Sequence, residues 1–161
     1  MCEHCGNQTE QDAAQADRRE KLSRLRHSTS HIMAEAVKSI FPDVKFAIGP
    51  SIADGYYYDF DLPRPLTEED LDAISAKMRE IVKANAPFEH STMDKESARA
   101  FFADQPYKLE LIDGIRDEEV SIYKQNTFTD LCAGPHVRRT GECKHFKLTS
   151  VAGAYWRGDS N

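Results

Sequence analysis

Apolar residues recur at helical spacing through the N-terminal part of the chain, and this pattern predicts one long helix. Asp12 and Gln15 fit the two ends of a capping box, so we expect the helix to begin at Asp12 and to stop near Ile40, before Pro42. Residues 1–11 are polar and are expected to form a flexible N-terminal segment. At about 100° per residue, one stripe of the helix collects the apolar positions: Leu22, Leu25, Ile32, Met33, Ala36 and Ile40.

The rest of the chain alternates short β-rich runs with shorter helical patterns. The β-rich runs predict strands at 45–48, 56–61, 87–93, 120–124, 127–131 and 144–151. Asp54-Gly55 and Gln125-Asn126 are typical of hairpin turns. Helices are predicted at 67–84, after Asp94, and at 108–112. This order predicts an α+β fold, in which a mostly antiparallel sheet packs against a long central helix and shorter helices.

Length and charge narrow the functional classes. The 161 residues are enough for one globular domain, expected over residues 12–161. The formal net charge of −6 makes the chain a poor nonspecific binder of nucleic acid, because phosphate neutralisation needs clustered Lys and Arg. No apolar run approaches the roughly 20 residues of a membrane span, and the polar start resembles no signal peptide. We therefore expect a cytoplasmic location and no membrane partner.

Histidine and cysteine occur in two pairs with the same spacing. His27 and His31 lie on adjacent turns of the predicted helix, and Cys132 and His136 repeat the spacing far down the chain. Together they form a His3Cys set, which has the chemistry of a zinc site. The two helical histidines lie nearly opposite the apolar stripe, so we expect them to face either water or a cleft.

This set leaves several chemistries open. Four protein ligands would close a zinc site and make it structural, whereas a catalytic zinc keeps one position open for water. Without a metal, His27 or His31 could position a water as a base, and Cys132 could act as a proton-transfer partner or, alternatively, as a covalent nucleophile. Asp130 could orient an imidazole or hold a substrate amine. Ser28 stands where H-E-x-x-H metalloproteases carry glutamate, so that class is excluded.

Five motifs follow one another along the chain and are listed here in order: Arg26-His27-Ser28-x-x-His31, Ala47-Ile48-Gly49-Pro50, Gly55-Tyr56-Tyr57-Tyr58-Asp59, Asp130-x-Cys132-x-Gly134-Pro135-His136, and Gly153-Ala154-Tyr155-Trp156-Arg157-Gly158-Asp159-Ser160. In this order they resemble the editing domain of bacterial threonyl-tRNA synthetases, over about residues 22–161. The wider superfamily includes the editing domain of alanyl-tRNA synthetase and its freestanding relatives, which share the paired histidine and cysteine motifs.

The resemblance implies hydrolysis of the ester that joins a wrongly attached serine to the 3′-terminal adenosine of tRNA(Thr). A difference of one methyl discriminates only about 10–200-fold, and serine, the smaller amino acid, cannot be excluded from a synthetic site by size. A second pocket that admits serine and refuses threonine completes a double sieve. The implied mechanism is attack by a positioned water, with no covalent enzyme intermediate.

The resemblance also assigns roles to individual residues. It places these side chains around the reacting ester: His27, His31, Cys132 and His136. It places Lys108, Asp130 and Tyr58 close by, with Gly49 and Pro50 in the substrate-binding motif. Lys108 could then hold an oxyanion or a ribose oxygen. The alanyl branch holds zinc at the four cluster positions, so we carry two alternatives forward: editing without a cofactor, and a site that holds Zn²⁺.

The implied partners are the 3′-aminoacyl end of tRNA(Thr) and the catalytic and anticodon-binding domains of a longer synthetase. We expect the chain to be a fragment of such an enzyme rather than a freestanding deacylase. Two other functions stay open. One is a zinc-dependent, alanyl-type trans-editing deacylase that removes serine from tRNA(Ala), against which the threonyl-like ending argues. The other is a non-enzymatic binding domain in which zinc staples the helix to the sheet.

Overall fold

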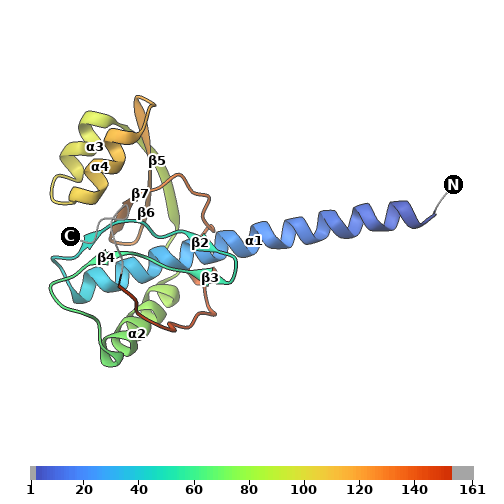
Figure 1. Cartoon of the computed structure of the whole chain (residues 1–161), viewed down its shortest axis with the longest axis horizontal. Helices are drawn as coiled ribbons and strands as arrows, with labels where there is room; N and C mark the ends of the chain where they lie inside the picture. Colours follow the sequence, from blue (N-terminus) through green and yellow to red (C-terminus); the bar gives the residue numbers. More distant parts are fainter. Residues whose placement is uncertain (1–2, 154–161) are drawn as a thin grey trace.

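The computed structural model describes residues 3–153, with side chains from residue 8 onward. Its longest element is helix α1, Glu3–Ile40, which projects from the molecule at its N-terminal end and lies in the middle of the fold toward its C-terminal end (Figure 1). The helix begins at Glu3, so the predicted start at Asp12 is wrong, and the segment expected to be flexible is helical from Glu3 onward. No proline interrupts this part of the chain, and the helix therefore continues past the possible cap.

Residues 28–37 of α1 are enclosed on all sides. Every side chain from Ser28 to Val37 is buried except that of Met33, which is half-buried. His31 is only 2% exposed, and its neighbour in the chain, the apolar Ile32, is 0% exposed. Of the two surroundings expected for the histidine pair, water does not apply to His31, because other elements cover both sides of the helix at this point.

The other helices are α2 (Glu68–Ala84), α3 (Lys95–Phe101), α4 (Pro106–Gly114) and the short 3-10 helix η1 (Thr140–Glu142). The strands are β1 (Lys45–Phe46), β2 (Ser51–Ile52), β3 (Gly55–Tyr56), β4 (Phe60–Asp61), β5 (Phe88–Asp94), β6 (Glu119–Gln125) and β7 (Phe128–Leu131). They pair antiparallel as β1–β4, β2–β3 and β5–β6–β7. The α+β class is confirmed, and within the described residues the strands form three small sheets.

Local capping explains why α2 and α3 begin where the sequence predicted. The Thr67 side chain accepts a hydrogen bond from the Asp70 backbone N–H at 3.2 Å, and the Asp70 carboxylate accepts one from the Thr67 N–H at 2.8 Å. The Asp94 carboxylate accepts from the Ser97 N–H at 2.8 Å. Each cap satisfies donors that the first helical turn leaves free.

Two predicted strands differ in the structure. The run 56–61 divides between β3 and β4, with residues 57–59 passing from one small sheet to the other. Segment 144–151 is not a strand. Phe146 and Leu148 pack against the core, which accounts for their alternating pattern. Nevertheless, the backbone of this segment pairs with no strand in the described part of the chain, and an extended run needs such pairing to become a strand.

The sheet β5–β6–β7 separates two hydrophobic clusters. One face carries Val120 and Ile122 against Ala98, Phe102 and Ile112 from α3 and α4. The other face turns Gln125, Phe128 and Asp130 toward α1, since alternate residues of a strand point to opposite faces. This alternation directs the end of β7 toward the histidines of α1.

Glu35 provides a test of how tightly α1 is enclosed. It is 5% exposed, its Oε2 accepts from the Asn126 Nδ2–H at 3.2 Å, and its Oε1 has no hydrogen-bond partner among the described residues. Burial raises the pKa of Glu35 from 4.5 to about 7. The folded chain therefore binds this proton more tightly than the unfolded chain does, and stability falls as pH rises from about 4.5 to about 7.

We expect Glu35→Gln to remove this contribution to the pH dependence. At pH 8 the variant should be more stable than the parent by about 1–3 kcal/mol, because no buried carboxylate has to ionise. Urea unfolding at several pH values measures this free energy. Glu10→Gln, at an exposed position of the same helix, is the matched control and should keep the parental profile. The same pH slope in Glu35→Gln as in the parent would contradict the assignment.

Candidate functional site

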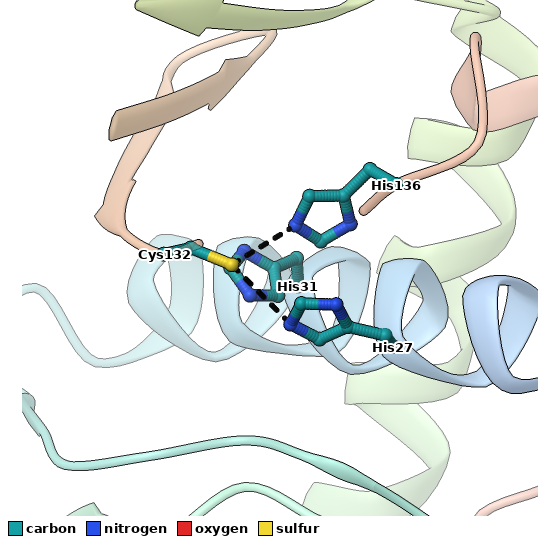
Figure 2. A group of neighbouring side chains, drawn as sticks. All are labelled: His27, His31, Cys132 and His136. Atoms are coloured by element: carbon teal, nitrogen blue, oxygen red, sulfur yellow. Dashed lines mark hydrogen bonds between the residues drawn. The ribbon is translucent and has the colours of Figure 1, made fainter. Parts of the chain in front are cut away.

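Four predicted side chains converge between α1 and the loop that follows β7. His27 and His31 come from successive turns of α1, while Cys132 and His136 reach them from the loop (Figure 2). Their ligand atoms all lie within 4.8 Å of one another. The Cys132 Sγ lies 3.3 Å from the Nε2 of His27 and 3.4 Å from the Nε2 of His136. The structure thus brings together two motifs about a hundred residues apart.

The loop geometry depends on a glycine. Cys132 continues the edge of the sheet, where its N–H donates to the Ser121 carbonyl at 3.0 Å. Gly134 then adopts a φ of 76°, which L side chains rarely take. A Cβ at Gly134 would lie 2.5 Å from the Tyr123 hydroxyl oxygen. Only glycine fits this turn, and the turn returns the chain so that His136 faces Cys132.

Backbone and hydroxyl groups orient two of the imidazoles. The His27 Nδ1 lies 3.1 Å from the Pro135 carbonyl oxygen. A carbonyl oxygen only accepts, so Nδ1 carries the proton, and Nε2 presents its lone pair toward Cys132. The His136 Nδ1 lies 2.9 Å from the Ser28 hydroxyl, which also accepts from the Val137 N–H at 2.9 Å. Ser28, which distinguishes this motif from the metalloprotease signature, therefore has a structural role at the site.

Burial keeps this cluster uncharged. It lowers the pKa of His27, and it lowers the pKa of His31 well below the usual 6.5, with the nearby charges of His27 and Lys108 adding to the effect. Burial and the two other histidines lower the pKa of His136 to about 2. Burial also raises the pKa of the Cys132 thiol to about 12. Near neutral pH the site therefore holds three neutral imidazoles and a protonated thiol, an environment that disfavours Cys132 as a nucleophile.

A buried ion pair lies directly behind His31. The Lys108 ammonium is 2.8 Å from Asp130 Oδ1, and both side chains are 3% exposed. The Tyr58 hydroxyl donates to Asp130 Oδ2 at 2.7 Å, and that oxygen lies 3.6 Å from His31 Nδ1. Lys108 also donates to the Ala47 carbonyl at 2.6 Å and to the Tyr58 hydroxyl at 3.1 Å. The three residues that the family pattern placed near the cluster are thus present there as one connected network.

The contacts in this network indicate which of the expected roles fit Lys108 and Asp130. An ammonium group has three N–H donors, and Lys108 directs all three at protein acceptors. Its geometry therefore favours positioning Asp130 over holding a substrate oxyanion. Asp130 is likewise enclosed, and its contacts favour orienting His31 and Tyr58 over holding a substrate amine.

Gly49 and Pro50 occupy different surroundings. A Cβ at Gly49 would lie 2.1 Å from Tyr58 Cδ2, so glycine is needed for the Tyr58 ring to pack there. The Gly49 carbonyl accepts from the Ser30 hydroxyl of α1 at 2.7 Å. Pro50 lines a cleft of about 480 Å³ that opens beside His27. Of the two residues, Pro50 is the one placed to meet a substrate.

The four cluster residues fit a zinc ion in their chemistry. A tetrahedral zinc with bonds of about 2.0–2.3 Å holds its ligand atoms roughly 3.3–3.7 Å apart, which matches the two measured distances to Cys132. Four protein ligands would leave no position for water, so an ion bound by all of them would brace the loop against α1.

Sequence reasoning missed several residues that shape the site. Phe88 stacks on the His136 ring with centroids 4.8 Å apart, and Tyr123 meets the same ring edge-on at 4.5 Å. Arg24 lines the cleft one turn before His27. The i, i+3 spacing of Arg24 and His27 could have indicated their shared face, but only the fold shows that a cleft lies over it.

Comparisons with known proteins agree with this geometry. Residues 120–161 match the family model described as the threonyl and alanyl tRNA synthetase second additional domain. Over 138 residues, 86% of this chain, the sequence is 61% identical to a threonine–tRNA ligase of Dehalococcoides mccartyi, of which it covers 24%. Over 146 residues, 89% of this chain, it is 56% identical to the threonine–tRNA ligase of Oleidesulfovibrio alaskensis, of which it covers 23%.

The C-terminal part of the chain is thus similar to the second additional domain of threonyl- and alanyl-tRNA synthetases, and most of the chain is similar to one part of threonine–tRNA ligases. Its similarity to threonine–tRNA ligases confirms the resemblance inferred from the five motifs. The chain spans about a quarter of the length of these relatives. The last motif, apart from Gly153, lies in residues 154–160, outside the described residues. Within the described part, no helix is long and apolar enough to cross a membrane.

Removing one partner of the buried Lys108–Asp130 pair should strongly destabilise the folded chain. We expect Asp130→Ala to lower the free energy of unfolding by about 3–5 kcal/mol, because it leaves the Lys108 ammonium buried without a counter-charge. Urea unfolding measures the loss. The double variant Lys108→Met, Asp130→Leu should recover most of it. Glu80→Ala, which breaks the exposed Lys77–Glu80 pair, is the control and should cost less than about 1 kcal/mol. Equal losses of unfolding free energy in Asp130→Ala and Glu80→Ala would refute the prediction.

Zinc should bind the cluster when it is supplied. We expect Zn²⁺ at about a hundredfold above its Kd to stabilise the chelator-treated chain by about 3 kcal/mol, through preferential binding to the folded state. Thermal unfolding with and without the ion provides the measurement. Cys132→Ser should lose the effect. Cys143→Ser, at a buried cysteine outside the cluster, should retain it. Stabilisation that survives Cys132→Ser would place the bound ion elsewhere.

Proposed function

We propose that this chain hydrolyses the aminoacyl ester of Ser-tRNA(Thr), as the editing domain of a cytoplasmic threonyl-tRNA synthetase. The observation that carries the proposal is the neutral imidazole of His27. It stands beside the Cys132 thiol in the wall of an open cleft, with its Nε2 lone pair free of any backbone contact. The match to the family model and the similarity to threonine–tRNA ligases support this choice of substrate class.

The chemistry of that substrate explains the need for such a site. A threonine-activating enzyme meets serine, which lacks one methyl group and therefore enters any pocket that threonine enters. Removing serine after transfer requires a second, smaller site that hydrolyses the ester. On this proposal the chain works beside the catalytic and anticodon-binding domains of the synthetase, and its ligand is the 3′-aminoacyl end of tRNA(Thr).

In the proposed hydrolytic step, His27 and Cys132 transfer protons and Asp130 has a positioning role. Water attacks the ester carbonyl carbon while His27 Nε2 takes one of its protons, for which a neutral imidazole is the required form. The bond between this carbon and the ribose oxygen then breaks, and the ribose oxygen receives a proton. The newly protonated His27 supplies it, either directly or through the Cys132 thiol, which gives up its own proton and takes the one on His27, so the net transfer is from water to ribose. Asp130, held by Lys108 and Tyr58, keeps His31 and the end of β7 in place behind the reacting groups.

A zinc ion held by the four cluster residues favours a second candidate function. Such an ion would supply a structural link between α1 and the loop, and the domain would then act as a zinc-stapled binding module. The close approach of the ligand atoms supports this candidate. Unfolding upon chelation, together with an absence of ester hydrolysis, would favour it over the deacylase.

Deacylation assays test the proposed function. We expect the chain to hydrolyse Ser-tRNA(Thr) and to leave Thr-tRNA(Thr) essentially intact. His27→Ala and Cys132→Ala should each slow hydrolysis by about 10²–10⁴-fold, since each removes a proton-transfer group. Release of labelled amino acid from each charged tRNA provides the rates. Between about pH 7 and pH 9 the enzymatic rate should stay nearly constant, because His27 is already neutral and Cys132 is still protonated.

Two controls keep this test specific. His145→Ala removes an exposed histidine outside the cluster and outside the cleft, and it should retain parental rates. Circular dichroism confirms that each variant is folded. Equal hydrolysis of the two charged tRNAs would refute the sieve, and parental rates in both site variants would refute the assignment of His27 and Cys132.

A further inference from the structure

Successive turns of α1 carry His31, His27 and Arg24 toward the surface. The spacing of i, i+4 and i, i+3 places neighbouring members on one side of the helix. Exposure increases outward in the same order: His31 is 2% exposed, His27 is half-buried, and the Arg24 side chain is 36% exposed. The helix therefore presents a cation one turn outside the reacting cluster.

Arg24 has more hydrogen-bonding capacity than its protein contacts use. Its guanidinium has five N–H donors, and Glu20 accepts from one of them, on the Nη2 atom, at 3.2 Å. The Nε–H is buried and has no acceptor among the described residues. A buried donor without a partner costs free energy, so this atom is poised to gain from an acceptor that arrives with a ligand.

The space in front of Arg24 is the same cleft that reaches His27. Its walls are the outer turns of α1, the segment Pro50-Ser51, and the turn Gly134-Pro135. A hydrogen bond of 2.9 Å between the Ser23 and Ser51 hydroxyls joins two of these walls. A ligand whose ester lies at His27 would therefore extend along α1 toward Arg24.

We propose that Arg24 binds the 5′-phosphate of the terminal nucleotide whose ester is cleaved at His27. This inference rests on the proposed function, since it takes the aminoacylated nucleotide as the ligand. The ester occupies one side of the ribose and the 5′-phosphate the other, so the phosphate is the anion nearest to the reacting group. A planar guanidinium with several free N–H donors matches phosphate oxygens in geometry and charge.

The simpler interpretation is that Arg24 only stabilises the helix through Glu20. That pair is an exposed i, i+4 contact with a single N–O distance within range, and Glu20 is 67% exposed. Such a pair contributes little and does not account for the buried Nε–H. In the proposed complex the Glu20 carboxylate competes with the phosphate, so neutralising Glu20 should strengthen phosphate binding.

Two stable probes separate the phosphate contribution from the rest of the ligand. They are 3′-seryl-amino-3′-deoxyadenosine and the same compound with a 5′-phosphate, whose amide link resists hydrolysis. Calorimetry with the full chain gives both affinities, and the quantity of interest is their ratio. We expect the phosphate to tighten binding at least about tenfold in the parent, as a charge-assisted contact should, and to do so less at high salt.

Substitutions on α1 then assign this ratio to one residue. Arg24→Gln should reduce it to less than about twofold, whereas Glu20→Gln should enlarge it. Arg19→Gln, at an exposed position of the same helix outside the cleft, should leave the parental ratio.

A ratio near one in the parent, including the case in which neither probe binds, would overturn the proposal. An undiminished ratio in Arg24→Gln would overturn it as well. The proposed function can fail separately: a phosphate preference that depends on Arg24, found in a chain that does not deacylate Ser-tRNA(Thr), would reject hydrolysis and keep the phosphate site.

Discussion

The buried pair of Lys108 and Asp130 holds the site together. Lys108 stands on α4, Asp130 ends the inward face of β7, and Tyr58 and Ala47 belong to the segments around β1 and β4. One ammonium group therefore joins three separate parts of the chain. Asp130 comes two residues before Cys132, so fixing its side chain also fixes the direction in which the loop leaves the sheet.

Stability alone does not explain such a pair. Removing two charges from water costs more than their attraction commonly returns, and apolar replacements of similar volume are often at least as stable. The pair does set a definite polar arrangement beside His31. Since α1 is buried on all sides at that point, the imidazoles have little water to solvate a charge, and the cluster stays neutral. The same enclosure that costs free energy thus keeps His27 unprotonated near neutral pH, which is the form that a general base requires.

Much of the fold was predictable because local rules decide it. Thr67 and Asp94 cap helices where the sequence indicated, and both predicted hairpins form, with turns at 53–54 and 126–127, each one residue from the predicted pair. Where predictions failed, the cause was packing between distant segments. Periodicity assigns one buried face to a helix, and it could not show that α1 is covered on both sides. Likewise, the alternation of Phe146 and Leu148 reports their burial and not a strand partner.

In the candidate site, too, the features set by local spacing were predictable and those set by contacts between distant segments were not. The equal spacing of the two motifs identified the four cluster residues. For His27 and His31 this spacing is a local property of a helix, whereas Cys132 and His136 meet because the loop turns at Gly134. The burial of Lys108 was not visible in the sequence, where an isolated lysine on a short helix is typical of a surface. Arg24 carried no signal either, because its importance depends on a cleft formed by Pro50 and Gly134, which are remote from it in sequence.

Charge sets a limit on how this domain can engage a nucleic acid. The net charge of −6 opposes long contact with a phosphate backbone. At the cleft, Arg24 is paired with Glu20, which carries the opposite charge. A domain built in this way gains little affinity from the body of a tRNA. On the proposed function it acts on the terminal nucleotide alone, and discrimination then depends on which amino acid the second, smaller site admits rather than on tight binding of the tRNA. Weak binding of the tRNA body suits a proofreading site, because a correctly charged tRNA must be released quickly.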